Sequence, residues 1–453
     1  MTGATANAPP TAPNPGAPVD ELAAVLAPTP GGLTSEIVAQ RSGRNSSTVR
    51  ARLADLDVAR ARLDQTLVQF LPRFSLRASY TRLSPVRSEF EAPGGGPGFA
   101  IESVDDNYAL TASLNVPLSD YLLRLSNAIS GSAANRRAAE LQHEAEALKV
   151  RTDAQALFYD WLRAQARVSI ARKTLEQTRA RLKDAGPAFE LGAITKADLM
   201  RLEALVASTE QVVLEADAYR SLSELQLAVA MGDPAPRGYV VGEDINARFA
   251  AQQGTLATLT REALTSRLEL RALEQAASSA RDAGRAMRGT SWPRLDAFGD
   301  VTYANPNQRI FPAEQKWDAT WSVGAAASWT FGDILLGRAQ GREMFATARS
   351  LDAQRGALVD GVRQDVAAQF LARERALGAI RTAARGLAAA QEGYRVATDL
   401  YRVGRATTTE VIAAETDLLT ARLNELNARI EARIADVRLK HAVGRDIGPH
   451  AKR

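Results

Sequence analysis

The sequence predicts a mostly helical protein with a smaller β part, in which one set of elements occurs twice. Three observations carry this prediction. One turn motif recurs at a fixed offset, four short segments alternate apolar and polar residues, and two very long segments carry apolar residues at helical spacing. Each observation also predicts where the elements begin and end.

The recurring motif is FELGAITKADL at residues 189–199 and YRVGRATTTEV at residues 401–411. Its glycines, Gly192 and Gly404, are 212 residues apart (404 minus 192). An aromatic residue precedes each glycine by three positions, and a threonine follows each by three. A glycine can adopt positive φ and end a helix, so each copy predicts a turn between two long helices.

The polar residues of the motif predict how the second helix of each pair begins. Thr195 and Thr407 suit the helix N-cap, and Asp198 and Glu410 stand at the third helical position of a capping box. An ordinary helical hairpin duplicated within the chain explains the glycine and the threonine. It does not explain why the two turns also share the aromatic and the acid.

Composition excludes several classes of function. Among 453 residues, 56 basic and 52 acidic residues are spread without a block, which predicts no nucleic-acid partner. The absence of cysteine excludes disulfides and thiol chemistry, and no His and acid spacing suggests a metal site. We therefore expect no enzyme and no cofactor. No run reaches the roughly 20 apolar residues of a membrane-spanning helix, so a bilayer crossing requires strands.

The predicted organisation has two repeats with a connector between them. The leader is rich in alanine, proline and glycine, and it lacks a basic start followed by an apolar segment, so no secretory signal is expected in it. The expected segments are a disordered leader 1–33, a first repeat 34–232, an equatorial connector 233–257, a second repeat 258–446 and a tail 447–453.

The elements of each repeat follow one order: helix, two strands, long helix, helix. A long link containing APGGGPG separates the first two strands and is expected to be an exposed loop. The first repeat predicts a helix over 46–71, strands over 74–81 and 108–118, and helices over 120–185 and from the turn to 231. The second predicts a helix over 258–288, strands over 295–303 and 317–331, and helices over 334–400 and 407–443.

The four strands separate an apolar face from a polar one, as in Phe74, Leu76, Ala78 and Tyr80 against the residues between them. A sheet that faces lipid on one side and water on the other requires this pattern. Two soluble hairpins packed as a sandwich explain it equally well. Four strands are too few to close a transmembrane barrel, so closure would require several chains.

The order of the motifs resembles the TolC-like outer-membrane factor (outer membrane efflux protein) family over about residues 34–446. The similar features are a P-R-F strand start, a strand ending in V-P-L-S-D, and F-x-L-G-x-x-T-x-x-D, followed by a second copy of the same order. The resemblance implies a homotrimer in which the helical hairpins form an α-barrel tunnel across the periplasm. Each protomer would contribute four strands to a 12-stranded barrel in outer-membrane lipid. A periplasmic adaptor (membrane fusion) protein and an inner-membrane pump or ABC exporter are the implied partners.

The resemblance also implies roles for residues of the two turns. Glu410 matches the first acid of a ring that closes the tunnel, whereas Ala413 occupies the place of the second acid. Ala406 occupies the place of the arginine that links neighbouring hairpins, which leaves Arg402 or Arg405 as its substitute. The implied aperture residues are Glu410, Asp198, Tyr401, Arg402 and Arg405. The implied adaptor-contacting tips are Leu191, Gly192, Ala193, Val403, Gly404 and Arg405.

Two functions from different classes follow. One is a passive conduit for tripartite efflux or type I secretion, located in the outer membrane and reaching into the periplasm. The other is a soluble coiled-coil scaffold without a membrane role, which the missing signal favours and the strand segments disfavour. No residue indicates which cargo a conduit would export.

Overall fold

The computed structural model of the chain describes residues 27–90, 99–102, 104–192, 194–245, 247, 249, 254–311 and 314–445. They form a mostly helical protein with one four-stranded antiparallel sheet, as the sequence predicts. The chain divides into two compact units, each with segments from both sequence repeats. The helical unit comprises residues 1–50, 145–267 and 360–453, and the sheet unit comprises residues 51–144 and 268–359.

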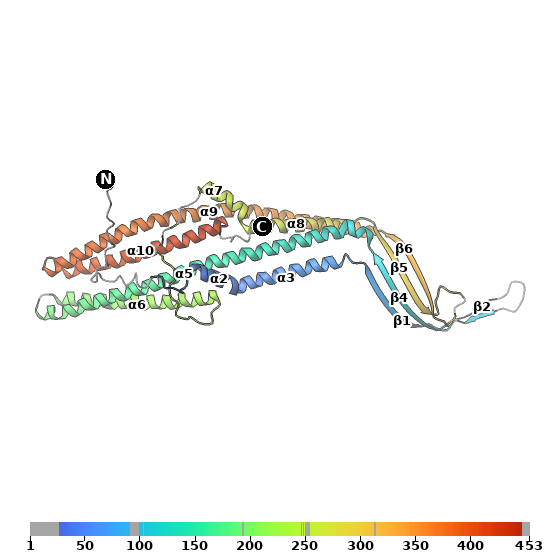
Figure 1. Cartoon of the computed structure of the whole chain (residues 1–453), viewed down its shortest axis with the longest axis horizontal. Helices are drawn as coiled ribbons and strands as arrows, with labels where there is room; N and C mark the ends of the chain where they lie inside the picture. Colours follow the sequence, from blue (N-terminus) through green and yellow to red (C-terminus); the bar gives the residue numbers. More distant parts are fainter. Residues whose placement is uncertain are drawn as a thin grey trace, which may run out of the picture. The chain divides into compact units, whose positions relative to one another are not determined.

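Two antiparallel helical hairpins make up most of the helical unit (Figure 1). The first joins α5 (Ser126–Glu190) to α6 (Lys196–Met231), and the second joins α9 (Phe331–Arg402) to α10 (Thr408–Val443). The N-terminal parts of α5 and α9 belong to the sheet unit. Alanine, leucine, arginine and glutamate dominate these segments, and they are the residues that cost least free energy in a helix. The predicted long helices and the two glycine turns between them are confirmed.

An apolar core holds the two hairpins together within the helical unit. Phe158, Trp161 and Leu162 of α5 are fully buried in it. Burying a side chain of this size contributes about 1.5–3 kcal/mol, so a cluster that joins four helices and the connector stabilises their packing. The other buried members come from α2, α5, α6, the connector and α10: Val38, Ala154, Tyr159, Ala166, Ile170, Leu227, Met231, Val241, Ile245, Leu426, Ile430 and Ile434.

A short helix that the sequence analysis missed, α2 (Ser35–Asn45), packs against the end of α6. The Arg41 guanidinium pairs with the carboxylate of Asp233 at 2.5 Å. The side-chain amide of Asn45 donates to the carbonyl oxygen of Met231 at 2.6 Å. Both contacts join α2 to residues almost 200 positions later. The sequence also carries a local signal for this helix, because the side chain of Thr34 caps its start by accepting a hydrogen bond from the N–H of Ile37.

The expected leader and connector meet in the helical unit. Residues 1–26 of the leader and 447–453 of the tail lie outside the described residues. The backbone N–H of Thr29 donates to the carbonyl of Val241 at 2.8 Å, and that of Leu33 donates to Val240 at 2.8 Å. The end of the leader therefore pairs with the connector through its main chain.

The sheet consists of β1 (Arg73–Arg82), β4 (Asp106–Val116), β5 (Arg294–Asn305) and β6 (Asp318–Ser328), in that order (Figure 1). All neighbouring pairs are antiparallel, which confirms the four predicted strands. The register sorts side chains into rows across the sheet. One apolar row runs through Leu76, Ala112, Val301 and Trp321, and the adjacent polar row runs through Arg77, Thr111, Thr302 and Thr320.

The link between β1 and β4 contains two strands that the sequence analysis treated as an exposed loop. β2 (Arg87–Phe90) pairs with β3 (Phe99–Glu102) in a separate two-stranded ladder. Strands of four residues are too short to show a clear period of two, so the pattern did not predict them. The glycine-rich segment 92–98 lies outside the described residues.

Two expected helices differ from the prediction. The start of the one expected over 120–185 is a short helix α4 (Leu118–Asp120) and a π-helical segment η1 (Tyr121–Leu125), which precede α5. The helix expected over 46–71 is α3 (Ser47–Val68), whereas the one expected over 258–288 is two helices, α7 (Leu256–Ser266) and α8 (Leu268–Gly289). They are separated at Arg267, whose ψ of 119° is extended. No helix within the described residues is both long enough and apolar enough to cross a membrane.

The end of α10 explains the break at Arg267. The hydroxyl of Ser266 donates to the carbonyl of Val443 at 2.6 Å, and the Arg267 guanidinium donates to that of Ala442 at 3.4 Å. These carbonyls have no partner within their own helix because they belong to its last turn. The interruption therefore provides hydrogen-bond donors for the last carbonyl groups of α10.

Candidate functional site at the paired helical turns

The first turn ends α5 with a glycine in the left-handed region. Gly192 has φ of 71°, and its N–H donates to the carbonyl of Phe189 at 2.9 Å. The hydroxyl oxygen of Thr195 accepts a hydrogen bond from the N–H of Asp198 at 3.2 Å. The Asp198 carboxylate accepts one from the N–H of Thr195, also at 3.2 Å. The predicted glycine turn and capping box are confirmed at α6.

The second turn repeats this geometry at the start of α10. Gly404 has φ of 73° and donates to the carbonyl of Tyr401 at 3.0 Å. Thr407 accepts from the N–H of Glu410 at 3.3 Å, and its own N–H donates to the Glu410 carboxylate at 2.6 Å. Both copies of the motif therefore form the same turn and the same cap, although Asp198 has one methylene fewer than Glu410.

The two capping carboxylates are stabilised in their charged form. Hydrogen bonds from the backbone N–H and the hydroxyl of Thr407 hold the pKa of Glu410 below its ordinary 4.5. Hydrogen bonds from Thr195, with a smaller effect of Arg201, hold the pKa of Asp198 below its ordinary 3.8. Their contribution to stability is complete above these ordinary values. It is lost as the pH falls through the lowered values of the folded protein.

The two turns lie side by side within the helical unit. Nη1 of Arg201, one turn into α6, donates to the Thr409 hydroxyl on α10 at 3.3 Å. The same nitrogen lies 3.3 Å from the Asp198 carboxylate. Arg201 thus joins the cap of the first hairpin to the first turn of the second. The turn motif does not predict this role for Arg201, because its partner is 208 residues away.

The apolar residues at the turns point into solvent. Leu191 is 85% exposed and Val403 is 68% exposed. Each lies beside a glycine, and a Cβ added to either glycine would have no neighbouring atom within 4 Å. Ala193, the third expected residue of the first tip, lies outside the described residues.

Neither arginine of the second turn reaches the first hairpin within the described part of the chain. Arg402 pairs with Asp399 on its own helix at 3.4 Å. Arg405 uses its backbone N–H to bond the carbonyl of Leu400 at 2.8 Å, and its side chain is exposed. The Tyr401 hydroxyl likewise has no hydrogen-bond partner among the described residues. Within one chain, the substitution of Arg402 or Arg405 for the link at Ala406 is therefore not seen.

A buried polar cluster deeper in the hairpins makes a further contact between them, in addition to that of Arg201. Arg181 of α5 donates to the Glu415 carboxylate of α10 and to the Tyr394 hydroxyl of α9. Its guanidinium also lies 5.2 Å from the centre of the Tyr394 ring. Glu415 is only 4% exposed, and its Oε1 has no partner among the described residues. Burial raises the pKa of Glu415 against the opposing effect of Arg181.

The sequence contains a signal for this cluster. Val411, Glu415 and Leu418 follow helical spacing and are all buried, so Glu415 is an acid on an otherwise apolar seam. A carboxylate in such a position needs a cation, since burying a charge alone is costly. Among the described residues, no three His, Cys, Asp or Glu side chains lie close enough together to hold a metal ion.

Solved structures resemble this chain along nearly its whole length. The outer-membrane channel OprN is 20% identical, with 98% of each chain covered and a TM-score of 0.73. VceC from Vibrio cholerae is 17% identical over 90% of this chain and 96% of its own, with a TM-score of 0.73. CmeC from Campylobacter jejuni is 15% identical, with 96% of this chain and 94% of CmeC covered and a TM-score of 0.71. At such identities the likeness shows the fold alone.

The family follows from the sequence itself. No curated protein matches the chain. The model of the family described as outer membrane efflux protein matches residues 38–233 and 259–445, which are most of both repeats. This match confirms the resemblance inferred from the paired turns and the repeated order of strands and helices. The chain therefore belongs to the outer membrane efflux protein family, whose members are outer-membrane efflux channels.

Proposed function

We propose that the protein is the exit duct of a tripartite efflux or type I secretion machine, through which cargo passes chemically unchanged. The observation that carries the proposal is a sheet with two free edges and an exposed apolar face. In the order β1, β4, β5, β6, the outer strands β1 and β6 each have one neighbour among the described strands. A finished sheet in lipid needs partners for both edges.

The apolar face of the sheet is exposed where a soluble sandwich would bury it. Phe74 and Leu76 on β1 are 70% and 65% exposed, and Trp321 and Val323 on β6 are 73% and 76% exposed. Soluble monomers rarely expose apolar patches of this kind. The pattern suits a surface that contacts hydrocarbon and disfavours the soluble coiled-coil scaffold.

Closure by several copies satisfies the free edges. Hydrocarbon offers no hydrogen-bond partner, so an open edge costs several kcal/mol for each unpaired group. Three copies with four strands each provide 12 strands, an even number within the range of outer-membrane barrels. The proposed assembly is therefore a homotrimer with a 12-stranded transmembrane barrel.

The helical unit also exposes an apolar stripe that suits contact with another copy. On α6, Leu214, Leu222, Leu225 and Val229 are 66%, 51%, 48% and 69% exposed. Their spacing places them along one side of the helix. Packing this stripe against a helix of a neighbouring protomer would continue the bundle around a closed tunnel in the periplasm.

The exposed turns suit contact with a periplasmic adaptor protein. Leu191 and Val403 offer apolar anchors, and the bare glycines beside them allow close approach of a partner backbone. The adaptor contact proposed here comprises Leu191, Gly192, Ala193, Val403, Gly404 and Arg405. An inner-membrane pump or ABC exporter would supply the energy, because the duct has no cofactor of its own in this proposal.

The same end of the hairpins is the proposed gate. Three Glu410 carboxylates in a trimer would form a cation-attracting ring, with each carboxylate still available on the side that does not bind Thr407. Asp198, Tyr401, Arg402 and Arg405 surround this ring in the proposal. The cluster of Arg181, Tyr394 and Glu415 would keep each protomer's two hairpins together while the gate is closed.

Extraction from cells tests the proposal against the scaffold alternative. We expect the full chain in the membrane fraction, soluble only with detergent, and migrating on unheated gels as a trimer that heat converts to monomer. A protein recovered in the aqueous fraction as a monomer would favour the coiled-coil scaffold and reject the duct.

A further inference from the structure

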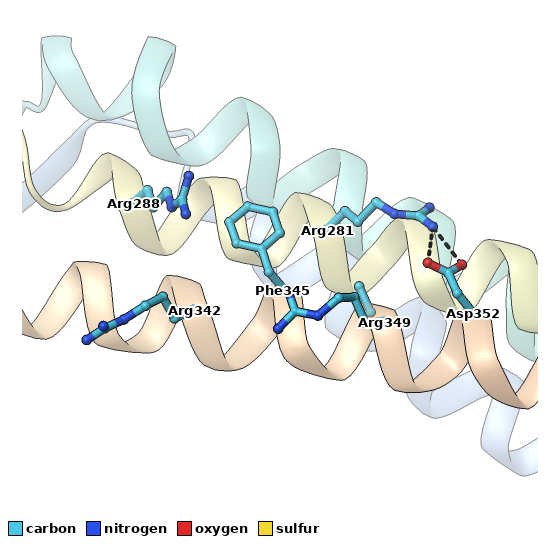
Figure 2. A pocket seen from close by; sticks show the side chains of 7 residues that line it. Arg281, Arg288, Arg342, Phe345, Arg349 and Asp352 are labelled. Carbon is cyan, nitrogen blue, oxygen red and sulfur yellow. Dashed lines mark hydrogen bonds and ion pairs between the residues drawn. The ribbon is translucent and has the colours of Figure 1, made fainter.

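A groove lined by arginines lies between α8 and α9 of the sheet unit, and the proposed duct mechanism makes no use of it. Its volume is about 500 Å³. Figure 2 shows that its side chains come from the two helices facing each other. α8 contributes Arg281 and Arg288, and α9 contributes Arg342, Phe345, Arg349 and Asp352.

The close approach of the two helices shapes the floor of the groove. A Cβ on Gly284 would lie 3.2 Å from the Phe345 ring, and one on Gly341 would lie 2.8 Å from Cγ of Arg288. The two glycines therefore make room for the ring and for the stem of the arginine. The guanidinium carbon of Arg288 lies 4.5 Å from the ring centre, a cation–π distance. Arg288 is thus held in place before any ligand arrives.

The groove carries more positive than negative charge. The Arg281 guanidinium binds both oxygens of Asp352 at 2.7 Å, which neutralises one pair. In the part of the chain that the structure describes, no carboxylate pairs with Arg288, Arg342 or Arg349. Three guanidinium groups without a counter-ion around one groove repel one another, and an anion placed between them removes that repulsion.

We propose that this groove binds the phosphate group of an anionic ligand. The planar fork of a guanidinium matches two phosphate oxygens at once, and such charge-assisted hydrogen bonds are among the strongest in proteins. Arg288 and Arg349 flank Phe345 (Figure 2) and provide the two forks. The ring and the buried Ala348 provide an apolar floor for the part of the ligand next to its phosphate.

Two sources offer this chemistry, a soluble phosphate compound and the headgroup of an anionic phospholipid. Either source could reach the groove. α8 leads into β5 and β6 leads into α9 within a few residues, so the groove is close in sequence to the sheet proposed to contact lipid. The groove therefore lies on the helices that adjoin the sheet on the chain. The shared phosphate group defines the site, and the experiment separates the sources.

The test is calorimetric titration of the purified full chain in a neutral detergent. One arm uses sodium pyrophosphate, and the other uses a short-chain phosphatidylglycerol dispersed in the same detergent. The arm with saturable binding identifies the source. We expect R288Q with R349Q to weaken that binding about 100-fold, at about tenfold for each guanidinium removed. Asp352→Asn removes the competing carboxylate, so it should tighten binding severalfold.

The matched control is R381Q with R385Q, which removes the same charge from two exposed arginines of α9 outside the groove. It should leave the Kd within about twofold. R349Q alone replaces the double variant if that protein fails to fold, because the Arg349 side chain is exposed. Equal losses in the groove and control variants, or no saturable binding in either arm, would overturn the proposal. If the groove variants dissociate the oligomer, the proposal is also overturned. That result would mean that the groove arginines bind a carboxylate of another copy and not a phosphate group.

Discussion

At the scale of single residues, Arg181 connects the two hairpins through groups that are hidden from water. It contacts α10 through Glu415 and α9 through Tyr394. The Glu415 side chain is 6% exposed and that of Arg181 is 21% exposed. Because the pair is mostly desolvated, removing one partner leaves a buried charge, and that loss exceeds the net value of the intact pair.

We expect Arg181→Ala to destabilise the contact between the hairpins by about 3 kcal/mol, the low end for a buried pair, because Arg181 is partly exposed. Amide exchange of α10 around Glu415 should then become about 100-fold faster. The control is Arg172→Ala on the same helix, since the pair of Arg172 with Asp217 is more exposed and costs less than about 1 kcal/mol to lose. Equal exchange in the two variants would show that the buried pair holds nothing together.

The capping box at the start of α10 allows the role of Glu410 in the proposed gate to be separated from its role in the cap. Glu410→Ala removes the carboxylate of this capping box, whereas Thr407→Ala removes its hydroxyl and keeps the carboxylate. We predict that Glu410→Ala raises ion conductance through the proposed closed duct and lowers its cation selectivity, because it also removes the charge of the proposed carboxylate ring. Single-channel recording in planar bilayers measures both quantities. If Thr407→Ala has the same effect, or Glu410→Ala has none, the proposed ring is not the barrier.

At the scale of elements, glycines occupy three different environments: Gly404 lies in a turn, Gly444 at a packed helix C-cap and Gly356 in a helix interior. Gly404 has positive φ and open space around it, so Gly404→Ala should cost about 1–2 kcal/mol of backbone strain. Gly444 has positive φ and a Cβ position 2.6 Å from the Ser266 hydroxyl, so Gly444→Ala should cost more. Gly356 lies inside α9 with nothing within 4 Å, so Gly356→Ala should stabilise by up to about 1 kcal/mol.

The melting temperatures of the three variants check this order by calorimetry. Gly356→Ala should melt above the unaltered protein, Gly404→Ala below it, and Gly444→Ala lowest. If Gly404→Ala has the same melting temperature as Gly356→Ala, the turn does not depend on the left-handed conformation of its glycine.

Local chemistry explains which elements could be predicted from sequence. The turns at Gly192 and Gly404 and their caps depend on residues within a few positions of one another, and the strands depend on a period of two. By contrast, α2 is fixed by Arg41 and its partner 192 residues away, and the buried cluster joins Arg181 to Glu415 across 234 residues. Separations of this length leave no periodic signal. Only the acid on the seam of α10 could have pointed to the cluster.

At the scale of the whole molecule, the free edges of the sheet are the reason for proposing that several copies assemble. One chain provides four strands in a single order, with β1 and β6 outermost among the described strands. Their exposed apolar side chains suit lipid, and their unpaired backbone does not. The proposed trimer resolves this conflict because β1 of one copy pairs with β6 of the next, three times around a closed ring.

Disulfide trapping between these edges tests that claim most directly. The chain contains no cysteine, so every cross-link comes from an introduced pair. Ser79→Cys on β1 is combined in turn with one cysteine at each β6 position from 320 to 328, and oxidised membranes are run on denaturing gels. We expect covalent dimers and trimers, strongest at alternate β6 positions because successive side chains face opposite sides of a sheet. Monomers with free thiols at every position, or ladders that continue beyond the trimer, would contradict it.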